Sequence, residues 1–260
     1  GVKYSSDSDV ILENGKILIV PPKLKNAIFT SPISGLDSSA FKGNQNIVQV
    51  TIPKESTLAS IPDDSFKGCK SLVAINIPDS VRTIGKNAFL GCSNLSDIEI
   101  SRNSSLRTLG DGAFSETGLL AIELPDNLEK VGNSCFAGCL NLSTVVFNGN
   151  AMQLIGDKAF QNTGLRAIEL PGCFKNLEPA IFDSCPNLKI IAFGEGSPYN
   201  FEGDAVYEGN RLLFVFPTAR YYTLPSTVES MRSDAFDIAG DLVEIINNGN
   251  DNYTVQHGIL

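Results

Sequence analysis

The chain has 260 residues, of which 42% are hydrophobic and 19% are charged, a composition typical of a globular protein with a large core. Its 29 acidic and 20 basic residues give a formal net charge of −9, and its lysines and arginines form no cluster, which disfavours nucleic acids and anionic lipid surfaces as partners. No apolar run reaches the roughly 18 residues that a membrane-spanning helix requires, so we expect no membrane insertion within this chain.

The first predicted element is a β-hairpin over residues 10–20. Two apolar runs flank the pair Asn14-Gly15, which supplies the positive φ of a tight turn. Residues 205–215 repeat this pattern around Gly209-Asn210, so we expect an equivalent hairpin there. The first hairpin is expected to cover the N-terminal end of the core, because a repeat array needs a cap.

Between and after these hairpins one pattern recurs along the chain. Each unit has two spaced apolar residues, an Ala-Phe pair, a small residue, and then Leu-x-x-Ile-x-Ile, often followed by Pro. The phenylalanines of successive units lie 22–25 residues apart, with one last unit after a longer interval. They are Phe41, Phe66, Phe89, Phe114, Phe136, Phe160, Phe182 and Phe236. A fixed period of this length is typical of a solenoid with one strand per coil.

The Leu-x-x-Ile-x-Ile piece predicts the strand, because Ile75 and Ile77 alternate with polar positions and so share one face. Its inward residues should form one buried ladder in a single parallel sheet. This ladder is Ile75, Ile98, Ile122, Val145, Ile168 and Ile191. Prolines such as Pro78 suit the strand ends, because Pro has no N–H for a ladder.

The return path predicts a bend, a short helical turn and a stacked aromatic ladder. A glycine follows the second apolar position of several units, where it would allow positive φ. These glycines are Gly85, Gly110, Gly132 and Gly156. The next residue, such as Asp111 or Asn133, could cap a helical turn that carries the Ala-Phe pair. The large phenylalanine rings are expected to stack on one another through the coils.

The expected organisation is a single solenoid domain over residues 1–260. It comprises a hairpin over residues 10–20, repeats over about residues 33–193, a hairpin over residues 205–215, a last repeat over about residues 224–246 and a partial cap over residues 253–260. His257-Gly258-Ile259-Leu260 resembles the opening of a third hairpin, so either the natural chain continues or this segment packs as the cap. No targeting segment opens the sequence, and Gly1-Val2-Lys3 resembles a mature or trimmed start.

With its motif Ala-Phe-x-x-Cys-x-x-Leu-x-x-Ile-x-Ile-Pro, the chain resembles the BspA-like leucine-rich repeats from about Ile33 to Ile246. The resemblance implies a right-handed, β-rich leucine-rich-repeat coil with a concave parallel sheet, short helical turns and inserted β-hairpins. It also implies an extracellular or bacterial cell-surface protein. Some relatives are similar to adhesins, so the implied partner is a protein or glycan, with host extracellular-matrix proteins among the candidates. The family has no catalytic residues to carry over.

The residues that could carry chemistry favour structural roles. His257 is the only histidine and lies away from every repeat, so we expect no catalytic triad, no enzyme activity and no cofactor. Four cysteines occupy one repeat position, where Asn or Thr stands in other units, which predicts a buried ladder of small side chains and no metal site. These are Cys69, Cys92, Cys139 and Cys185. Cys135 is expected in the core, and Cys173, in a Pro-Gly-Cys bend, is the strongest candidate for a reactive thiol.

Two further segments are interpreted as turns. Gly194-Glu195-Gly196 opens no helical pattern, so a turn is favoured over a phosphate-binding loop. The run from Asn247 to Asn252 offers oxygen ligands but lacks the spaced carboxylates of a calcium loop, so a polar turn is favoured there too.

The outward strand residues supply the candidate binding site. One residue per unit lies between the two inward positions. In order these are Thr51, Asn76, Glu99, Glu123, Val146, Glu169, Ala192 and Ile246. Three are glutamates and Asp97 adds a fourth carboxylate, although like charges on neighbouring strands repel. Paired carboxylates also occur in glycosidases, but nothing in the sequence predicts a pocket around these.

We therefore predict a non-catalytic recognition or adhesion module whose concave face binds a partner at Asp97, Glu99, Glu123 and Glu169. The competing interpretation of these residues is a merely solvated sheet face. The competing function is a structural spacer or scaffold domain of a cell-surface protein.

Overall fold

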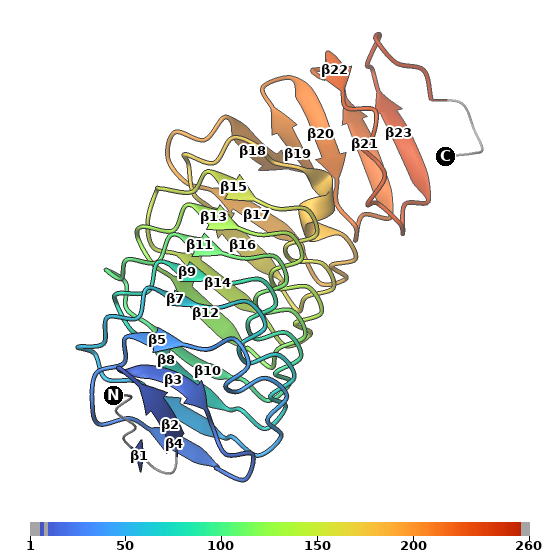
Figure 1. Ribbon diagram of the computed structural model, residues 1–260. Helices are drawn as coiled ribbons and strands as arrows, with labels where there is room; N and C mark the ends of the chain where they lie inside the picture. The colour runs from blue at the N-terminus through green and yellow to red at the C-terminus, as the bar shows by residue number, and fades with distance from the viewer. Residues whose placement is uncertain (1–5, 8–9, 256–260) are drawn as a thin grey trace.

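The chain winds as an elongated solenoid of stacked coils, with its two ends at opposite ends of the molecule (Figure 1). The structure is a computed structural model that describes residues 6–7 and 10–255. No helix in these residues is both long enough and apolar enough to cross a membrane. The predicted solenoid is confirmed, and almost all of its regular structure is β.

The longer strand of each coil joins a row of parallel strands along one side of the solenoid (Figure 1). This row contains β4 (Asn26–Ile28), β6 (Gln49–Thr51), β8 (Ala74–Ile77), β10 (Asp97–Ile100), β12 (Ala121–Leu124), β14 (Thr144–Phe147), β16 (Ala167–Leu170), β17 (Ile190–Phe193), β21 (Tyr221–Pro225) and β23 (Glu244–Asn248). Hydrogen bonding along the row is discontinuous: β4, β6, β8 and β10 form one sheet, followed by the pairs β12–β14, β16–β17 and β21–β23. The prediction of a single continuous sheet is therefore wrong.

Two of the interruptions have a local cause in the sequence. The coils of β12 and β16 carry Thr117-Gly118-Leu119 and Thr163-Gly164-Leu165 where other coils have Cys-x-x-Leu, so their turn into the strand is one residue shorter. A Cβ atom on Gly118 would collide with the carbonyl of Ser93 in the preceding coil. Glycine is therefore needed at the shortened turn, and the strand that follows pairs only with the next coil.

The inward ladder is confirmed at five of its six positions. Ile75, Ile122, Val145, Ile168 and Ile191 are all buried. Ile98 is only partly buried, so the prediction is wrong there. Its strand β10 pairs with β8 but not with β12.

A second row of short parallel strands lies on the return path of the coils. It contains β5 (Gly35–Leu36), β7 (Ser60–Ile61), β9 (Thr83–Ile84), β11 (Thr108–Leu109), β13 (Lys130–Val131), β15 (Leu154–Ile155) and β22 (Ser230–Met231). From β7 to β15 these strands form one sheet. The second residue of each strand in this sheet, such as Ile84 or Leu109, is apolar, points inward and is buried.

The predicted helical turns are mostly absent from the described residues. One 3₁₀ helix, η1 (Pro179–Phe182), is present, and the Ala-Phe segments of the other coils are non-helical turns. Their backbone bonds run between coils, for example from Phe89 N–H to the Ala113 carbonyl at 2.8 Å. The polar residue expected to cap a helix does the same, since Asp111 Oδ1 accepts the Asn133 N–H at 2.8 Å. Stacking between coils thus satisfies groups that a helix would satisfy internally.

The glycines at the bend have ordinary φ values, so the predicted positive φ is also wrong. Close packing explains these glycines instead. A Cβ atom on Gly110 would lie 2.7 Å from the backbone carbon of Gly85 and 2.7 Å from the nitrogen of Lys86. Contacts this short with backbone atoms cannot be relieved by a side-chain movement, so only glycine lets adjacent coils approach this closely.

The aromatic ladder is confirmed. Seven phenylalanine rings, from Phe41 to Phe182, stack on one another with centroid separations of 4.6–5.9 Å. Phe236, in the last coil, instead contacts Tyr222 edge-on at 5.9 Å. The stacked rings and the inward strand residues belong to one continuous core.

Both predicted hairpins are confirmed. The first consists of β2 (Val10–Glu13) and β3 (Lys16–Ile19), and β1 (Ser6–Asp7) pairs with β2. The second consists of β19 (Ala205–Glu208) and β20 (Arg211–Val215), and β18 (Tyr199–Glu202) pairs with β19. Each hairpin continues into the short-strand row, because β3 pairs with β5 and β20 pairs with β22. Of the predicted cap at residues 253–260, residues 256–260 lie outside the described residues.

Candidate functional site

Two of the four predicted carboxylates come together over a depression in the sheet face. Asp97 and Glu99 lie two residues apart on β10, so they point to the same outer side, and both are exposed. The depression spans β6, β8 and β10 and has a volume of about 580 Å³. Its polar lining includes Gln49, Thr51, Lys54, Asn76, Asp97 and Glu99. The carboxylates form its wall on the β10 side.

Asn76, at the centre of this depression, is held by the backbone of the preceding coil. Its side-chain oxygen accepts the Ile52 N–H at 2.8 Å, and its side-chain nitrogen donates to the Ile52 carbonyl at 2.7 Å. Just beyond β6, the Asn76 side-chain amide thus makes the two hydrogen bonds that the backbone of a neighbouring strand would otherwise make. This pair of bonds fixes the floor of the depression.

The other two predicted carboxylates lie on strands that are not hydrogen-bonded to β10. Glu123 lies on β12 opposite Val146, and Glu169 lies on β16 opposite Ala192. Hydrogen bonding along the row is interrupted between β10 and β12 and again between β14 and β16. Among the described residues, none of the four carboxylates forms an ion pair. The four carboxylates thus lie along one row of strands, two on β10 and one each on β12 and β16.

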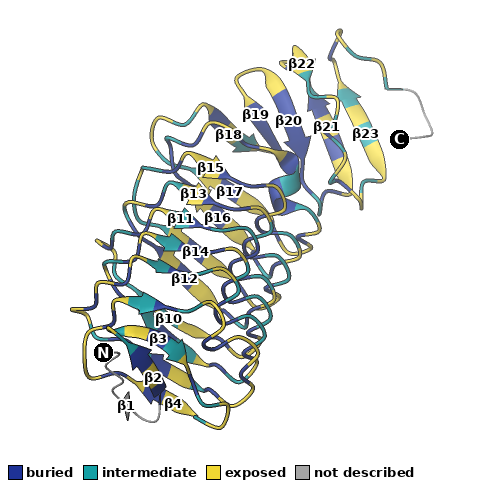
Figure 2. Ribbon diagram, viewed as in Figure 1, coloured by how far each residue is buried: buried dark blue, intermediate teal, exposed yellow. Residues whose placement is uncertain are grey.

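Sequence reasoning missed part of the apolar surface on the same face. Val146, Ile190, Tyr221 and Ile246 point outward from β14, β17, β21 and β23, and each is exposed. In Figure 2 the strands of the row alternate between buried and exposed residues. Val146 and Ile246 were among the predicted outward residues. Ile190 and Tyr221 occupy the first outward position of their strands, where the sequence analysis named only Asp97. The outer face thus carries exposed apolar residues between its carboxylates and beyond them.

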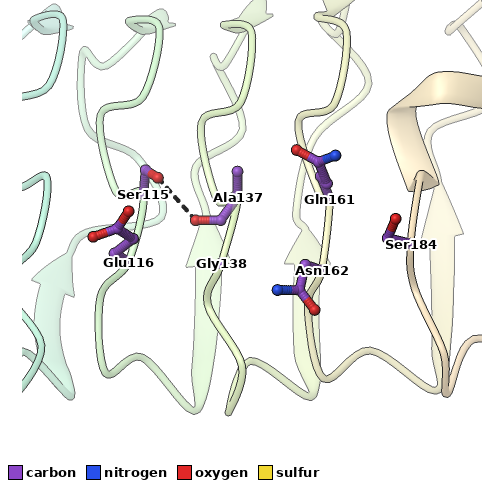
Figure 3. A pocket seen from close by; sticks show the side chains of 7 residues that line it. All are labelled: Ser115, Glu116, Ala137, Gly138, Gln161, Asn162 and Ser184. Carbon is purple, nitrogen blue, oxygen red and sulfur yellow. Dashed lines mark hydrogen bonds between the residues drawn. The ribbon is translucent and has the colours of Figure 1, made fainter.

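A second, polar furrow crosses the Ala-Phe turns (Figure 3). It has a volume of about 460 Å³ and is lined by Ser115, Glu116, Ala137, Gly138, Gln161, Asn162 and Ser184. Ser115 Oγ donates to the Ala137 carbonyl at 2.9 Å, and Gln161 Nε2 donates to Asp183 at 2.7 Å. Several of its polar groups thus bond neighbouring coils, and no aromatic ring lines it. These features indicate that the furrow results from the stacking of the turns and is not a ligand site.

The ladder cysteines are buried, as predicted, and each thiol has a structural bond. Cys92 Sγ donates to the Phe66 carbonyl at 3.0 Å, and Cys69, Cys139 and Cys185 make the equivalent bond to the preceding coil. Burial raises the pKa of the Cys69 thiol to about 11 and raises the pKa values of the other three. A protonated thiol that donates a hydrogen bond is a poor nucleophile and a poor metal ligand.

The remaining two cysteines differ in burial. Cys135 is buried as predicted, whereas Cys173 is half-buried and its thiol donates to the Met152 carbonyl at 3.3 Å. Within the part of the chain that the structure describes, no three His, Cys, Asp or Glu side chains gather as a metal site would require. His257 lies outside that part. Gly194-Glu195-Gly196 forms the predicted turn.

In the run from Asn247 to Asn252, the first two residues end β23 and the predicted polar turn covers residues 249–252. Asn247 Oδ1 accepts the Asn250 N–H at 2.7 Å. The buried Asn250 side chain donates to the carbonyls of Pro225 and Val228 at 2.7 and 2.8 Å. The Asn250 side-chain amide therefore bonds the end of the last coil to the coil before it.

Comparison with known proteins agrees with this architecture. Residues 21–121 and 107–237 match the model of the BspA type leucine rich repeat region, in six copies. No curated protein matches the sequence. A leucine-rich repeat protein from Bacteroides ovatus is 21% identical, with a TM-score of 0.66 over 97% of this chain and 67% of that one.

Two further solved structures share the fold. A leucine rich cell surface protein from Faecalibacterium prausnitzii is 21% identical, with a TM-score of 0.69 over 91% of this chain and 74% of that one. The pneumococcal vaccine antigen PcpA is 20% identical, with a TM-score of 0.67 over 95% of this chain and 65% of that one. Identities this low support the fold, and the family follows from the repeat match: the chain belongs to the BspA-type leucine-rich repeat proteins.

Proposed function

We propose that this protein is a non-catalytic recognition module of a cell surface or its surroundings, and that its sheet face binds a cationic segment of a partner protein. The observation that carries the proposal is the pair Asp97 and Glu99, exposed and free of ion pairs in the described residues, at the wall of a depression of about 580 Å³. Glu123 and Glu169 extend the negative field along the same face.

The location is supported by the relatives. One protein of the same fold is described as a cell surface protein and another as a vaccine antigen. A solenoid also offers an extended surface that suits a large partner. A host extracellular-matrix protein with a basic segment is the first partner to test, and a glycan is the second.

Electrostatics sets the expected behaviour of this site. Exposed carboxylates attract a cationic partner mainly by raising the association rate, and added salt screens that attraction. Binding should therefore weaken as the ionic strength rises, and most of the loss should appear in the association rate.

The test begins with a binding screen of the purified chain against matrix proteins and glycans. Any partner found is then measured against the triple variant Glu99→Lys, Glu123→Lys and Glu169→Lys. The matched control is Glu195→Lys, Glu202→Lys and Asp241→Lys, which makes the same change in net charge at exposed positions elsewhere. The proposal expects the first variant to lose binding and the control to keep it.

Equal binding by the site variant and the wild type would place the contact elsewhere. An equal loss of binding in the site variant and the control would mean that net charge alone causes the effect. The absence of any partner in the screen would favour the competing role, a structural spacer that holds other domains away from the surface.

A further inference from the structure

The depression over β6, β8 and β10 has opposite charges on its two sides. Lys54 lies three residues after Thr51, the last residue of β6, and Asp97 and Glu99 lie on β10. Strand β8 pairs with β6 on one side and with β10 on the other. β10 therefore lies two strand spacings from β6, about 9.6 Å away. A ligand in the depression would meet an ammonium group on one side and two carboxylates on the other.

An apolar surface lies between these charges. Gln49, Ala74 and Asp97 face outward side by side, because Gln49 pairs with Ala74 and Ala74 pairs with Asp97. The alanine side chain is a single methyl group, so it leaves space over β8. Pro53 adds apolar atoms to the lining on the side of Lys54. The space between the charges therefore suits an aliphatic chain.

The neutral polar side chains of the lining already have partners within the molecule. Gln49 Nε2 donates to Thr51 Oγ1 at 3.4 Å, and the Asn76 amide makes both of its bonds to the backbone of Ile52. The charged side chains differ, because among the described residues none of them forms an ion pair or a side-chain hydrogen bond. They are Lys54, Asp97 and Glu99. The bonding capacity left open in the depression is thus charged and of both signs.

Lys54 differs from the equivalent basic residue two coils later, which is paired. Arg102 holds the same position of its coil as Lys54, and it forms an ion pair with Asp126 of the next coil at 3.0 Å. Asp79 holds the position of Asp126 in the coil after Lys54, yet these two described residues form no ion pair. Asp79 also lies outside the lining of the depression. Lys54 thus lines the depression with its charge unpaired.

We infer that this depression binds the C-terminal residue of a partner chain when that residue is lysine or arginine. Its side-chain cation bonds Asp97 and Glu99, its free α-carboxylate bonds Lys54, and its methylene stem lies over Ala74. The ammonium group of lysine stands at the end of a four-carbon stem, so one terminal residue supplies both charges with an aliphatic chain between them. An internal lysine has no carboxylate and would leave Lys54 unpaired.

This inference rests on the proposed function, since both assign a cation to Asp97 and Glu99. It adds the requirement for a chain terminus. Glu123 and Glu169 take no part in that requirement, because they lie outside the depression. The inference and the proposed function can therefore fail separately.

The test measures fluorescence polarisation of the peptide Gly-Ser-Gly-Ala-Lys, labelled with fluorescein at its N-terminus. One form ends in a free carboxylate and a second form in an amide, and a third peptide has norleucine in place of lysine. The wild type should bind the free lysine form about fivefold more tightly than the amide, the upper range for one exposed ion pair. It should also bind the lysine form more tightly than the norleucine peptide, which lacks the cation.

Two variants assign the two ends of the ligand. Lys54→Gln should bind the free and amidated lysine peptides equally, because it removes the partner of the carboxylate. Glu99→Gln should weaken both lysine peptides by a similar factor. The matched controls Lys70→Gln and Glu195→Gln remove the same charges at exposed positions outside the depression and should behave as the wild type. Circular dichroism verifies that each variant is folded.

Equal binding of the free and amidated lysine peptides by the wild type overturns the inference and leaves the proposed cationic segment standing. A preference for the free carboxylate that survives in Lys54→Gln overturns the role of Lys54. A norleucine peptide that binds as tightly as the lysine peptide overturns the role of Asp97 and Glu99, and it counts against the proposed function as well. Failure of all three peptides to bind at roughly millimolar concentration also overturns the inference, and the proposed function is then decided by its own triple variant.

Discussion

Replacing Gly110 by Ala tests why the bends of this solenoid contain glycine. Gly110 has an ordinary φ, so alanine meets no backbone strain there. Its Cβ atom would meet three backbone atoms of the preceding coil, at 2.7, 2.7 and 3.0 Å. Because backbone cannot rotate away as a side chain can, the two coils must separate locally. We expect a loss of about 1–3 kcal/mol in the free energy of unfolding, the usual cost of overpacking.

Two control glycines separate the physical causes. A Cβ atom on Gly240 would have no neighbouring atom within 4 Å, and Gly240 has no positive φ, so Gly240→Ala should be neutral or stabilising by about 0.4–1 kcal/mol through the unfolded chain. Gly43 is equally open but has a φ of +71°, so Gly43→Ala should cost about 1–2 kcal/mol from backbone strain alone. Gly110→Ala thus tests close approach between coils, Gly43→Ala tests positive φ, and Gly240→Ala is the control with neither constraint.

The assay is urea unfolding followed by circular dichroism, with midpoints compared at equal slope. A fourth variant, Gly110→Asn, decides between close packing and positive φ. Asparagine tolerates positive φ better than alanine but is larger, so close packing predicts that Gly110→Asn is less stable than Gly110→Ala. A Gly110→Asn variant more stable than Gly110→Ala, or a Gly110→Ala variant as stable as Gly240→Ala, would refute the packing argument.

Two further predictions concern the core. Phe114 has a stacked ring on each side, so Phe114→Ala should cost about 3–5 kcal/mol, whereas Phe236→Ala, which loses one edge contact from a partly buried ring, should cost clearly less in the same urea assay. The buried thiol of Cys69 has a pKa raised to about 11 from an ordinary value of 9.0, so its contribution to stability is complete below pH 9 and is lost as the pH rises toward 11. Alkylation at pH 8.5 should accordingly be slow in the native protein and rapid in urea, and fast native labelling of Cys69 would contradict its burial.

Much of the fold follows from the sequence because one repeat contains its own structural signals. The alternation around Ile75 defines a strand, the pair Asn14-Gly15 defines a hairpin turn, and the regular recurrence of Phe places one ring above another. The burial of Cys69 and its equivalents follows in the same way, because a small residue recurs at one position of the coil. Each of these signals acts within one unit or through exact repetition of it.

The candidate site was only partly accessible to such reasoning. The outward direction of Asp97 and Glu99 follows from strand alternation, but the depression beside them depends on how β6, β8 and β10 stack. The interruption of the hydrogen-bond ladder between Glu99 on β10 and Glu123 on β12 was equally out of reach, because a repeat pattern treats the ladder as continuous.

The sequence by itself determined that this chain is a solenoid of BspA-type coils with two equivalent hairpins, because period, alternation and turn residues are local properties. Only the tertiary structure decided what lies between the coils. It showed that Gly110 serves close approach and that Asp111 bonds the next coil. The physical reason is that these features depend on the distance between coils 22–25 residues apart in sequence and on which coil has a neighbour, and neither is contained in a single repeat.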